Sequence, residues 1–335
     1  MTMRAYDLMD SVLDRSVILG YTKIGPALRR LWWPADPPSD AMAGRTVLVT
    51  GATSGLGRAT AARLGRLGAT VHVHGRSPEK VDETIGQLRS AVPGADFRPE
   101  LCDLSDLDDV RRFGTDLSQR MPALDALIHN AGVMAPDRRE TPQGHELTLA
   151  VMVLSTHLLN QLLSDSLAAA DSPAMVVFMS SGGMYAAGLH DEDPEYSAGS
   201  YSASTAYARC KRMQVVLAQM WSERLGSLGI EVASTHPGWV DTEGVAESMP
   251  RFRAVMRPLL RSPESGADTA AWLVATRPTA AGTTRFWHDR RLRPTSFGPA
   301  RDQSPQRRER LWDYVAAATD TPAWNDHDDA DRGLA

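Results

Sequence analysis

The stretch VTGATSGLGRAT, residues 49–60, decides the fold of this chain. Its glycines, Gly51, Gly55 and Gly57, stand between the apolar run RTVLVT and an alanine-rich segment of helical composition. Small residues at such a turn let the backbone bend tightly, and they let a phosphate approach the free N–H groups at the start of the helix. Strand, glycine turn and helix in this order are the context that a dinucleotide-binding motif requires. The stretch therefore predicts the first strand and helix of a nucleotide-binding α/β domain.

The same alternation continues along the chain. Helices are predicted between the strands: one opens at Ser77 and Pro78, one at residues 105–110, and a long one is entered at TPQG, residues 141–144. The alternation indicates a single Rossmann-type doubly wound domain, with a parallel sheet and helices on both faces. The predicted strands lie within residues 45–50, 69–75, 96–104, 124–130, 174–180, 230–238 and 283–289.

Two segments lie outside this alternation. Residues 1–43 are expected to form an N-terminal helical arm that ends in the proline-rich break WWPADPPSD. Residues 44–300 are expected to form the NAD(P)-binding catalytic domain. Residues 301–335 are expected to form a C-terminal helix and the acidic tail NDHDDADRGLA, for which disorder is predicted.

The overall composition excludes several classes of protein. The 335 residues are 42% hydrophobic and 23% charged with a net charge of −5, so a soluble globular protein is expected and nucleic-acid binding is not. Cys102 and Cys210 support neither a disulfide framework nor a metal site, and they suit a reducing cytoplasm. No apolar run is expected to reach the roughly 20 residues of a membrane span. Acidic residues near the start interrupt any signal-peptide core.

The segment GPALRRLWWP, residues 25–34, leaves two alternatives for the arm. Trp32 and Trp33 could anchor it at a membrane surface, or the arm could pack across the main domain. Moderate hydrophobicity and the lack of a long basic face favour packing. A weak peripheral membrane contact stays open as the second alternative.

Tyr207 and Lys211 stand one helical turn apart, so their side chains share a face. Such pairs are common on helices, but a lysine beside a phenol would favour the phenolate and fit the tyrosine for acid–base work. Four further motifs surround the pair in order: CDL at 102–104, NAG at 130–132, SS at 180–181 and HPG at 236–238 with Thr242. With the glycine turn, this combination resembles the short-chain dehydrogenase/reductase family over about residues 45–290. SSGGM and HPGWVDTEGV bring it closest to the dehydrogenase/reductase member 12-like branch.

The resemblance implies a role for each motif. Tyr207 is expected to be the acid/base, Lys211 to lower its pKa and hold the nicotinamide ribose, and Ser181 to hydrogen-bond the substrate oxygen. From the residues alone, Asp103 could instead cap the next helix, and the glycine of NAG could serve a turn. The residues expected to bind the cofactor are Gly51, Thr53, Ser54, Gly55, Leu56, Gly57, Arg76, Asp103, Leu104, Asn130, Ala131, Gly132, Tyr207, Lys211, Pro237, Gly238, Val240 and Thr242.

The end of the second strand bears on the choice of cofactor. A carboxylate there would bond the ribose diol of NAD(H) and repel a 2′-phosphate. The strand ends instead in His74 and Gly75, and Arg76 follows, whose guanidinium could bind a phosphate. NADP(H) is therefore predicted over NAD(H). The alternative is that Arg76 lies solvated at the surface.

One residue departs from the family pattern. The family usually places an asparagine on the long helix, where it links the lysine to solvent through a bound water, and that position here is Met152. Methionine cannot donate and does not usefully accept a hydrogen bond. Three hypotheses follow. The protein is an oxidoreductase with a modified proton relay, or it binds NADP(H) with weak turnover and acts as a sensor or scaffold. The third, which the sequence favours least, is a membrane-surface anchor protein that uses the N-terminal arm.

The substrate is expected to be a small-molecule carbonyl or alcohol. An insertion at residues 182–200 and the segment 239–260 are expected to line and cover the pocket. Trp239, Met249, Phe252 and Met256 suggest an apolar lid and a lipophilic substrate, although these side chains could equally be the packing core of the lid. The resemblance also allows a homodimer through the long helices at about residues 143–168 and 202–226.

Overall fold

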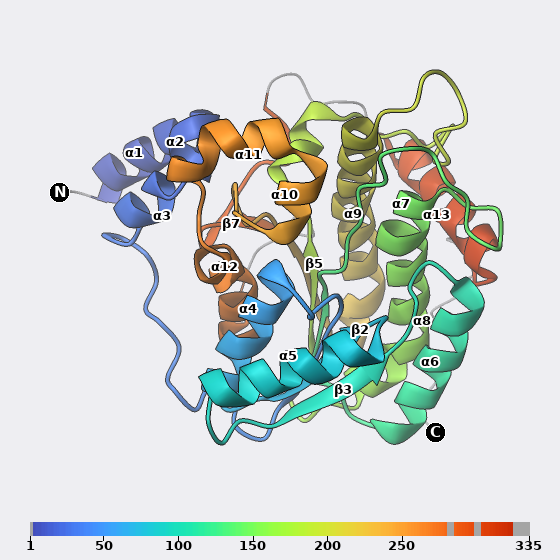
Figure 1. Ribbon diagram of the computed structural model, residues 1–335, viewed down its shortest axis with the longest axis horizontal. Helices are drawn as coiled ribbons and strands as arrows, with labels where there is room; N and C mark the ends of the chain where they lie inside the picture. Colours follow the sequence, from blue (N-terminus) through green and yellow to red (C-terminus); the bar gives the residue numbers. More distant parts are fainter. Residues whose placement is uncertain (1–2, 280–284, 298–302, 324–335) are drawn as a thin grey trace.

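The computed structural model describes residues 3–279, 285–297 and 303–323 (Figure 1). Their strands form one eight-stranded sheet in the order β3-β2-β1-β4-β5-β6-β7-β8, parallel except for the last pair. This confirms the α/β class and the parallel sheet that the sequence predicts. The strands are β1 Thr46–Val49, β2 Thr70–Gly75, β3 Phe97–Leu101, β4 Ala126–His129, β5 Met175–Met179, β6 Glu231–Thr235, β7 Phe286–His288 and β8 Arg291–Leu292.

Helices cover both faces of the sheet. One core lies between the sheet and α4, α5 and α12, and the other lies between the sheet and α6, α8, α9 and α13 (Figure 1). The helices are α1 Met3–Arg15, α2 Val17–Tyr21, α3 Ile24–Arg29, α4 Gly55–Arg66, α5 Pro78–Ala91, α6 Leu107–Arg120, α7 Leu147–Leu149, α8 Ser155–Ala168, α9 Ala203–Leu225, α10 Glu243–Ser248, α11 Pro250–Met256, α12 Pro263–Thr276 and α13 Pro305–Thr319.

The first strand shows why two cores form. Val47 and Val49 of β1 enter the core under α4, whereas Leu48 enters the opposite core. Successive side chains of a strand point to opposite faces, so a fully apolar strand needs cover on both sides. The continuous apolar run that predicts the strand thus also requires helices on both faces.

The helix starts are partly as predicted. Ser77 caps α5 by accepting a hydrogen bond from the Lys80 amide, as expected. The long helix, however, does not begin at TPQG. That segment is a turn, with Gly144 at a φ of +84°, and α7 begins at Leu147 because the buried Glu146 carboxylate accepts the first free N–H groups. The predicted start was therefore wrong by a few residues.

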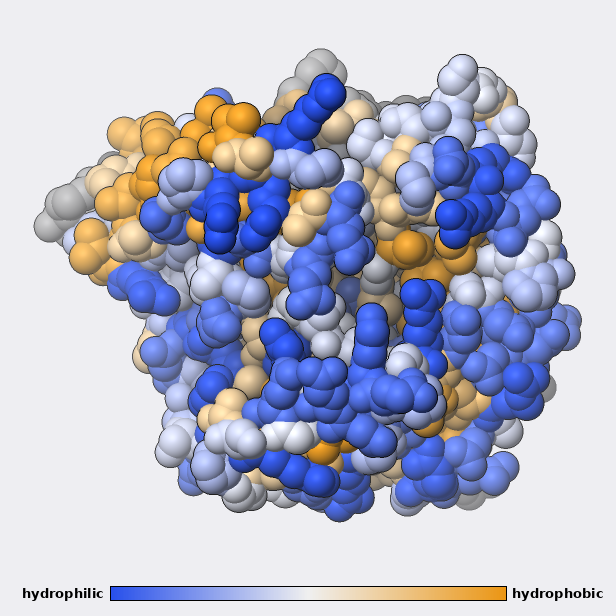
Figure 2. Space-filling view, viewed as in Figure 1, coloured by the Kyte–Doolittle hydropathy of each residue, from blue (hydrophilic) through white to orange (hydrophobic). Residues whose placement is uncertain are grey.

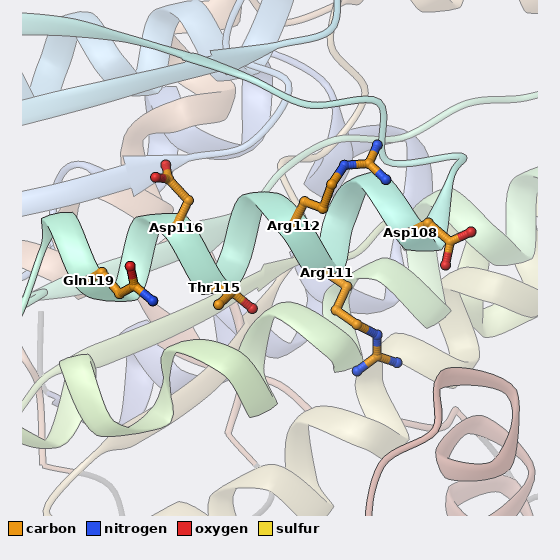
Figure 3. Close-up of a pocket in the computed structure, with 6 residues that line it drawn as sticks. All are labelled: Asp108, Arg111, Arg112, Thr115, Asp116 and Gln119. Carbon is orange, nitrogen blue, oxygen red and sulfur yellow. The ribbon is translucent and has the colours of Figure 1, made fainter.

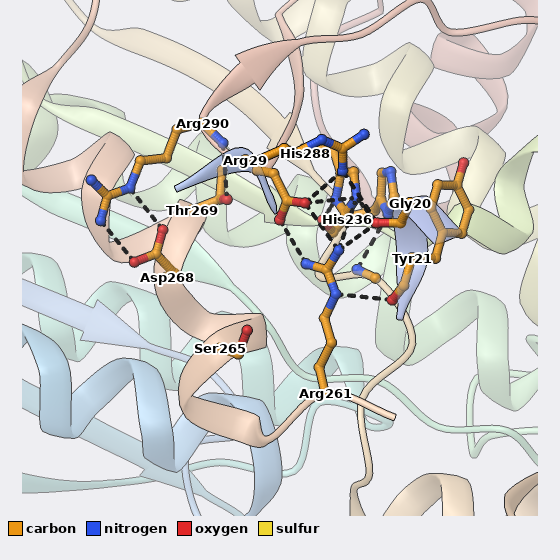
Figure 4. A network of polar contacts seen from close by, with 12 residues as sticks. Gly20, Tyr21, Arg29, His236, Arg261, Ser265, Asp268, Thr269, His288 and Arg290 are labelled. Carbon is orange, nitrogen blue, oxygen red and sulfur yellow. Dashed lines mark hydrogen bonds and ion pairs between the residues drawn. The ribbon is translucent and has the colours of Figure 1, made fainter. Parts of the chain in front are cut away.

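The N-terminal arm packs against the catalytic domain through buried ion pairs (Figure 4). Arg29 of α3 contacts Asp10 of α1 at 2.8 Å and Asp289 after β7 at 2.6 Å. Arg261 contacts the same Asp289 at 2.6 Å and donates to the Tyr21 carbonyl oxygen at 2.9 Å. Charges buried this deeply persist only where partners satisfy them, so the arm is held in one position.

The outer face of the arm is apolar (Figure 2). Trp32 and Trp33 do not contribute to it as free anchors, since Trp32 packs against Tyr6 and Trp33 lies under the Arg290 guanidinium. Apolar side chains of the three arm helices and of the turn after α3, together with one of α11, form this face instead, which we call the arm face. Its exposed apolar members are Leu8, Met9, Val12, Val17, Ile18, Leu19, Leu28, Leu31 and Val255.

One stretch of the described chain has the length and hydropathy of a membrane span, which the sequence prediction overlooked. It runs from Leu147 to Ala168, and 78% of its apolar window is buried inside the domain. A helix that is buried on all sides in a protein core is hydrophobic on all of its faces, as a membrane span is. The apolar character of this stretch thus follows from its place in the core.

Helix α13 lies against α8 and α9, the two helices through which a homodimer was expected. Its Trp312 packs against Trp221 of α9 and His157 of α8, with ring centres 4.9 and 4.7 Å apart. The homodimer stays a prediction, but α13 covers part of the surface it would use. The predicted acidic tail at 325–335 falls outside the described residues.

Candidate active site

The carboxyl ends of β1 to β6 meet at one edge of the sheet. The strand order reverses between β1 and β4, and in doubly wound sheets ligands bind outside the strand ends at that point. Most of the predicted site residues lie in the loops that leave these ends or in the first turn of α4, and Tyr207 and Lys211 lie on α9. Residues far apart in sequence, from Gly51 to Thr242, therefore face a common region.

The glycine turn is shaped for close approach of a phosphate. Gly51 and Gly55 have φ values of +61° and +48°, which side-chain-bearing residues rarely adopt. A Cβ on Gly57 would stand 2.2 Å from the Gly51 carbonyl oxygen and 2.5 Å from the Asn130 amide nitrogen. Ser54 occupies the N-cap of α4 without a side-chain cap, so first-turn N–H groups stay available for an anion. This donor set fits the pyrophosphate of a nicotinamide nucleotide.

His74 fixes the glycine turn, a role that sequence reasoning missed. Its Nδ1 accepts from the Gly51 amide at 3.2 Å, and its Nε2 therefore carries the proton and donates to the Cys102 carbonyl oxygen at 3.1 Å. Burial lowers the pKa of His74 to about 4, so the ring is neutral. The signal was a histidine at the end of a buried strand, where β2 carries two histidines, His72 and His74.

Arg76 follows β2 at the surface. It is exposed and makes no hydrogen bond or ion pair with any residue that the structure describes. Gly75 before it is buried against Thr53 and Val81, where a Cβ would stand 2.5 and 2.8 Å from their methyl groups. Neither His74 nor Gly75, the last residues of β2, carries a carboxylate, and the charged Arg76 follows them.

Asn130 joins the ends of β1 and β4. Its side-chain amide donates to the carbonyl oxygens of Thr50 and Gly51 at 3.0 Å, and the Thr50 hydroxyl accepts from the amides of Asn130 and Ala131. These bonds engage the side-chain nitrogen of Asn130. The loop from Asn130 to Gly132, which follows β4, lines the site.

Asp103 does not cap the next helix. The N-cap of α6 is Asp106, and the Asp103 carboxylate accepts instead from the Ser105 amide and hydroxyl. Leu104 beside it is buried in the core. The capping alternative for Asp103 is therefore wrong, and its side chain shapes the loop after β3.

The loop after β6 is held by the arm and by α12. Gly238 has a φ of +78°, and a Cβ there would stand 2.4 Å from the Arg261 side chain. Val240 is buried and paired with Arg261 through a short parallel bridge. Thr242 caps α10, and its methyl group lies against the position of Gly55. Pro237 contacts α12 near Gly266. This loop and the glycine turn are thus adjacent.

Tyr207 and Ser181 come together at the end of β5. Burial raises the pKa of Tyr207 to about 12, and a hydrogen bond from the Ser181 side chain opposes the rise. Ser181 lies at the start of a short 3-10 turn, Gly182–Ala186, and accepts from the Gly183 amide at 3.1 Å. The neighbouring Ser180 is buried and donates to the Lys211 carbonyl oxygen, so its hydroxyl is occupied.

Lys211 shares a face of α9 with Tyr207. Its Nζ lies 5.3 Å from the centre of the phenol ring and donates to the Met179 carbonyl oxygen at 2.6 Å. Burial lowers the pKa of Lys211 to about 7, and the Cys210 thiol opposes this shift. A nearly buried amine with a near-neutral pKa beside a phenol is an arrangement suited to proton transfer.

Met152 lies in a π-helical turn, Ala150–Leu154, where α7 passes into α8. Its side chain is fully buried, with Sδ 3.6 Å from the position a Cβ of Gly132 would take. Asn160, two turns on, bonds His129 at 2.8 Å and does not face the lysine. Sequence reasoning missed Gln214, whose side chain lies between Lys211 and this turn.

The segment expected to form a lid folds into α10 and α11. Trp239 and Phe252 pack edge to face with ring centres 5.2 Å apart, so these two side chains contribute to packing within the lid. Met249 and Met256 are half-buried. A separate open hollow lies on the outer face of α6, lined by polar residues such as Arg111 and Asp116, and contains none of the predicted site residues (Figure 3).

Comparison with known proteins agrees with this geometry. The model of the family described as short chain dehydrogenase matches residues 45–251. Dehydrogenase/reductase SDR family member 12 from Bos taurus is 34% identical, over 87% of this chain and 91% of its own. Retinol dehydrogenase 14 from Homo sapiens is also 34% identical, over 87% of this chain and 90% of its own. Among solved structures, Pseudomonas aeruginosa RhlG in complex with NADP aligns with a TM-score of 0.60 and 26% identity, over 74% of this chain and 96% of that one.

Proposed function

The chain belongs to the short-chain dehydrogenase family and is thus an oxidoreductase that uses a nicotinamide nucleotide, and from this premise we propose that it transfers hydride between NADP(H) and a lipophilic carbonyl or alcohol. The observation that carries the proposal is the meeting of Ser181, Tyr207 and Lys211 at the sheet edge that also holds the glycine turn. When bound, the nucleotide supplies the hydride chemistry, and the protein supplies position and a proton.

Each of the three residues has a distinct task in this proposal. Tyr207 donates a proton to the carbonyl oxygen in reduction and accepts one in oxidation. Ser181 hydrogen-bonds that oxygen and so stabilises the charge that develops on it. Lys211, when protonated, favours the phenolate form of Tyr207 and holds the nicotinamide ribose.

Arg76 supports NADP(H) over NAD(H). Its guanidinium is exposed and unpaired within the described part of the chain, and a carboxylate that would repel a 2′-phosphate is missing at that strand end. The related RhlG structure contains NADP. NAD(H) remains the second candidate, and the ratio of the two Michaelis constants decides between them.

The lipophilic substrate is supported by the half-buried Met249 and Met256 of the lid segment and by the relative that is named a retinol dehydrogenase. The arm face supports a peripheral membrane contact, because a contiguous exposed apolar surface needs a covering partner. Basic side chains, among them Arg15, Lys23 and Arg30, are exposed at the ends of the same helices. We expect the protein to float with anionic vesicles in a density gradient. A lack of flotation at low salt would exclude the membrane contact.

The cytoplasmic location stays a prediction.

The alternative is an NADP(H)-binding protein with weak turnover, a sensor or scaffold, since Met152 stands where the relay asparagine is expected. NADPH consumption against a panel of aldehydes, ketones and quinones separates the two hypotheses. Turnover of one carbonyl with a kcat of about 1 s⁻¹ or more is expected for the enzyme. Tight NADPH binding without turnover on any of them would favour the sensor.

A further inference from the structure

Gln214 connects Lys211 to the π-helical turn at Met152. Its Oε1 accepts from the Lys211 Nζ at 3.0 Å, and its Nε2 donates to the Met152 carbonyl oxygen at 2.7 Å. Gln214 and Met152 are fully buried, and Lys211 is 3% exposed. The three residues therefore form a continuous chain of hydrogen bonds within the core beside the candidate active site.

The direction of this chain is fixed by chemistry. An ammonium group only donates hydrogen bonds and a main-chain carbonyl only accepts them, so a bridge between the two needs one acceptor and one donor. A side-chain amide has both at the correct ends. Glutamate in this place would set a carboxylate oxygen against the carbonyl oxygen, and methionine of similar length would leave both partners unsatisfied.

We propose that Gln214 is a positioning residue for Lys211. Its side-chain amide links the lysine amine to the Met152 carbonyl and holds the amine beside Tyr207. Met152 stands where the family usually has the asparagine that links the lysine to solvent. The π-helical turn contributes because its carbonyl oxygen is turned toward α9 and accepts the Gln214 amide. Thr156 also donates to this oxygen, at 3.3 Å, so the acceptor itself is held in place. The catalytic consequence rests on the proposed function, whereas the contact to Lys211 does not.

The surroundings of the amine let this role be measured. Among the residues that the structure describes, the ionisable groups beside Lys211 are the Tyr207 phenol and the Cys210 thiol, and burial raises the pKa of both, so both are neutral at pH 7. The Met179 carbonyl of β5 accepts a hydrogen bond, and Gly132 and the Met152 side chain present no charge. A change in the acceptor at Gln214 should therefore appear directly in the protonation of Lys211.

The chain contains three lysines, Lys23, Lys80 and Lys211, and the first two are exposed. Lysine labelled with ¹³C and ¹⁵N thus gives three resonances in the full-length protein without added nucleotide, and loss of a signal in Lys211→Arg assigns the buried one. In the wild type we expect it to titrate near pH 7. Gln214→Met removes an acceptor from the charged form and should lower this pKa by about one unit, whereas Gln214→Glu should raise it by about one unit or more.

The control is Gln219→Met, the same exchange on the same helix at a residue that is 8% exposed, and it should leave the titration unchanged. Unchanged titration of Lys211 in both Gln214 variants would overturn the proposal, because a packing role predicts no opposite shifts. If Gln214→Met does not fold, Gln214→Asn, which is too short to reach both partners, should lower the pKa in its place. Should the wild type lack turnover, the proposed function fails while this titration still tests the contact. In an active enzyme, Gln214→Met should lower kcat by about 10- to 100-fold.

Discussion

The backbone amide of Trp239 donates to the carbonyl oxygen of Tyr21 at 2.7 Å. Tyr21 belongs to the N-terminal arm, and Trp239 stands in the loop that carries Val240 and Thr242. Arg261 donates to the same carbonyl oxygen, and its charge is balanced by Asp289. The arm is thus part of the structure that positions the candidate cofactor loop.

Loss of the Asp289 carboxylate should uncouple these elements. In Asp289→Asn, Arg261 loses its buried carboxylate partner, while Arg29 keeps Asp10, so we expect the free energy of unfolding to fall by about 3–5 kcal/mol. The affinity for NADPH should fall as well, because the loop loses its support. Chemical denaturation and fluorescence titration measure the two effects. Asp7→Asn, which removes an exposed ion pair of the same arm, should cost at most about 1 kcal/mol. Equal effects of the two variants would contradict this account.

The glycine turn offers a matched test of close approach. In Gly57→Ala the new methyl group would clash with the Gly51 carbonyl oxygen and the Asn130 side chain, so nucleotide binding should be lost or weakened at least tenfold. Gly86 lies in α5 with open space around its Cβ position, and Gly86→Ala should stabilise the protein by about 0.5–1 kcal/mol with NADPH affinity unchanged. Isothermal titration with NADPH checks both variants. Wild-type affinity in Gly57→Ala would show that the turn does not contact the nucleotide.

Cofactor preference should depend on one side chain. Arg76→Glu places a carboxylate where a 2′-phosphate would bind, so we expect the Michaelis constant for NADPH to rise at least tenfold and that for NADH to stay equal or fall. The control is Arg66→Glu, which makes the same change of charge at the exposed far end of α4 and should alter neither constant. Parallel changes in both constants would argue that Arg76 does not distinguish the cofactors.

The buried lysine predicts a pH dependence of stability. The folded-state pKa of Lys211 is about 7, whereas the unfolded chain keeps the ordinary value of 10.5. Between pH 7 and 10 the unfolded state therefore binds more protons, and the stability of the free protein should rise with pH by at most about 1.4 kcal/mol per unit. The destabilising effect is fully present below pH 7. The unfolding free energy of the wild type minus that of Lys211→Met, measured by denaturation at pH 7, 8 and 9, should increase with this slope. A constant difference would mean that Lys211 stays charged in the folded state.

Much of this architecture could be predicted from sequence because it follows from local rules. The apolar run before Gly51 and the cap at Ser77 each act through neighbouring residues, and each lies where expected. The start of the long helix was misplaced because a buried glutamate, Glu146, provides its cap, and glutamate is not among the preferred capping residues. Leu147–Ala168 was not predicted to be long enough to span a membrane. It has this length because α7, the π-helical turn and α8 form one continuous helical stretch.

The second layer of the site could not be predicted. His74 and Gln214 act through partners that are 23 to 62 positions away, such as Gly51 and Met152, and only the packed sheet brings these atoms together. The buried network of the arm likewise joins Asp10 and Arg29 to Asp289, across most of the chain. Spacing rules report neighbours along one helix or strand, so such contacts leave no pattern in the sequence.

The most direct test of the central claim is the turnover of Tyr207→Phe. Consumption of NADPH with the best carbonyl of the panel should fall by about 10²- to 10⁴-fold, while NADPH affinity stays close to that of the wild type, because only the proton donor is removed. Turnover in Tyr207→Phe that equals the wild-type rate would contradict the assignment of Tyr207 as the acid/base.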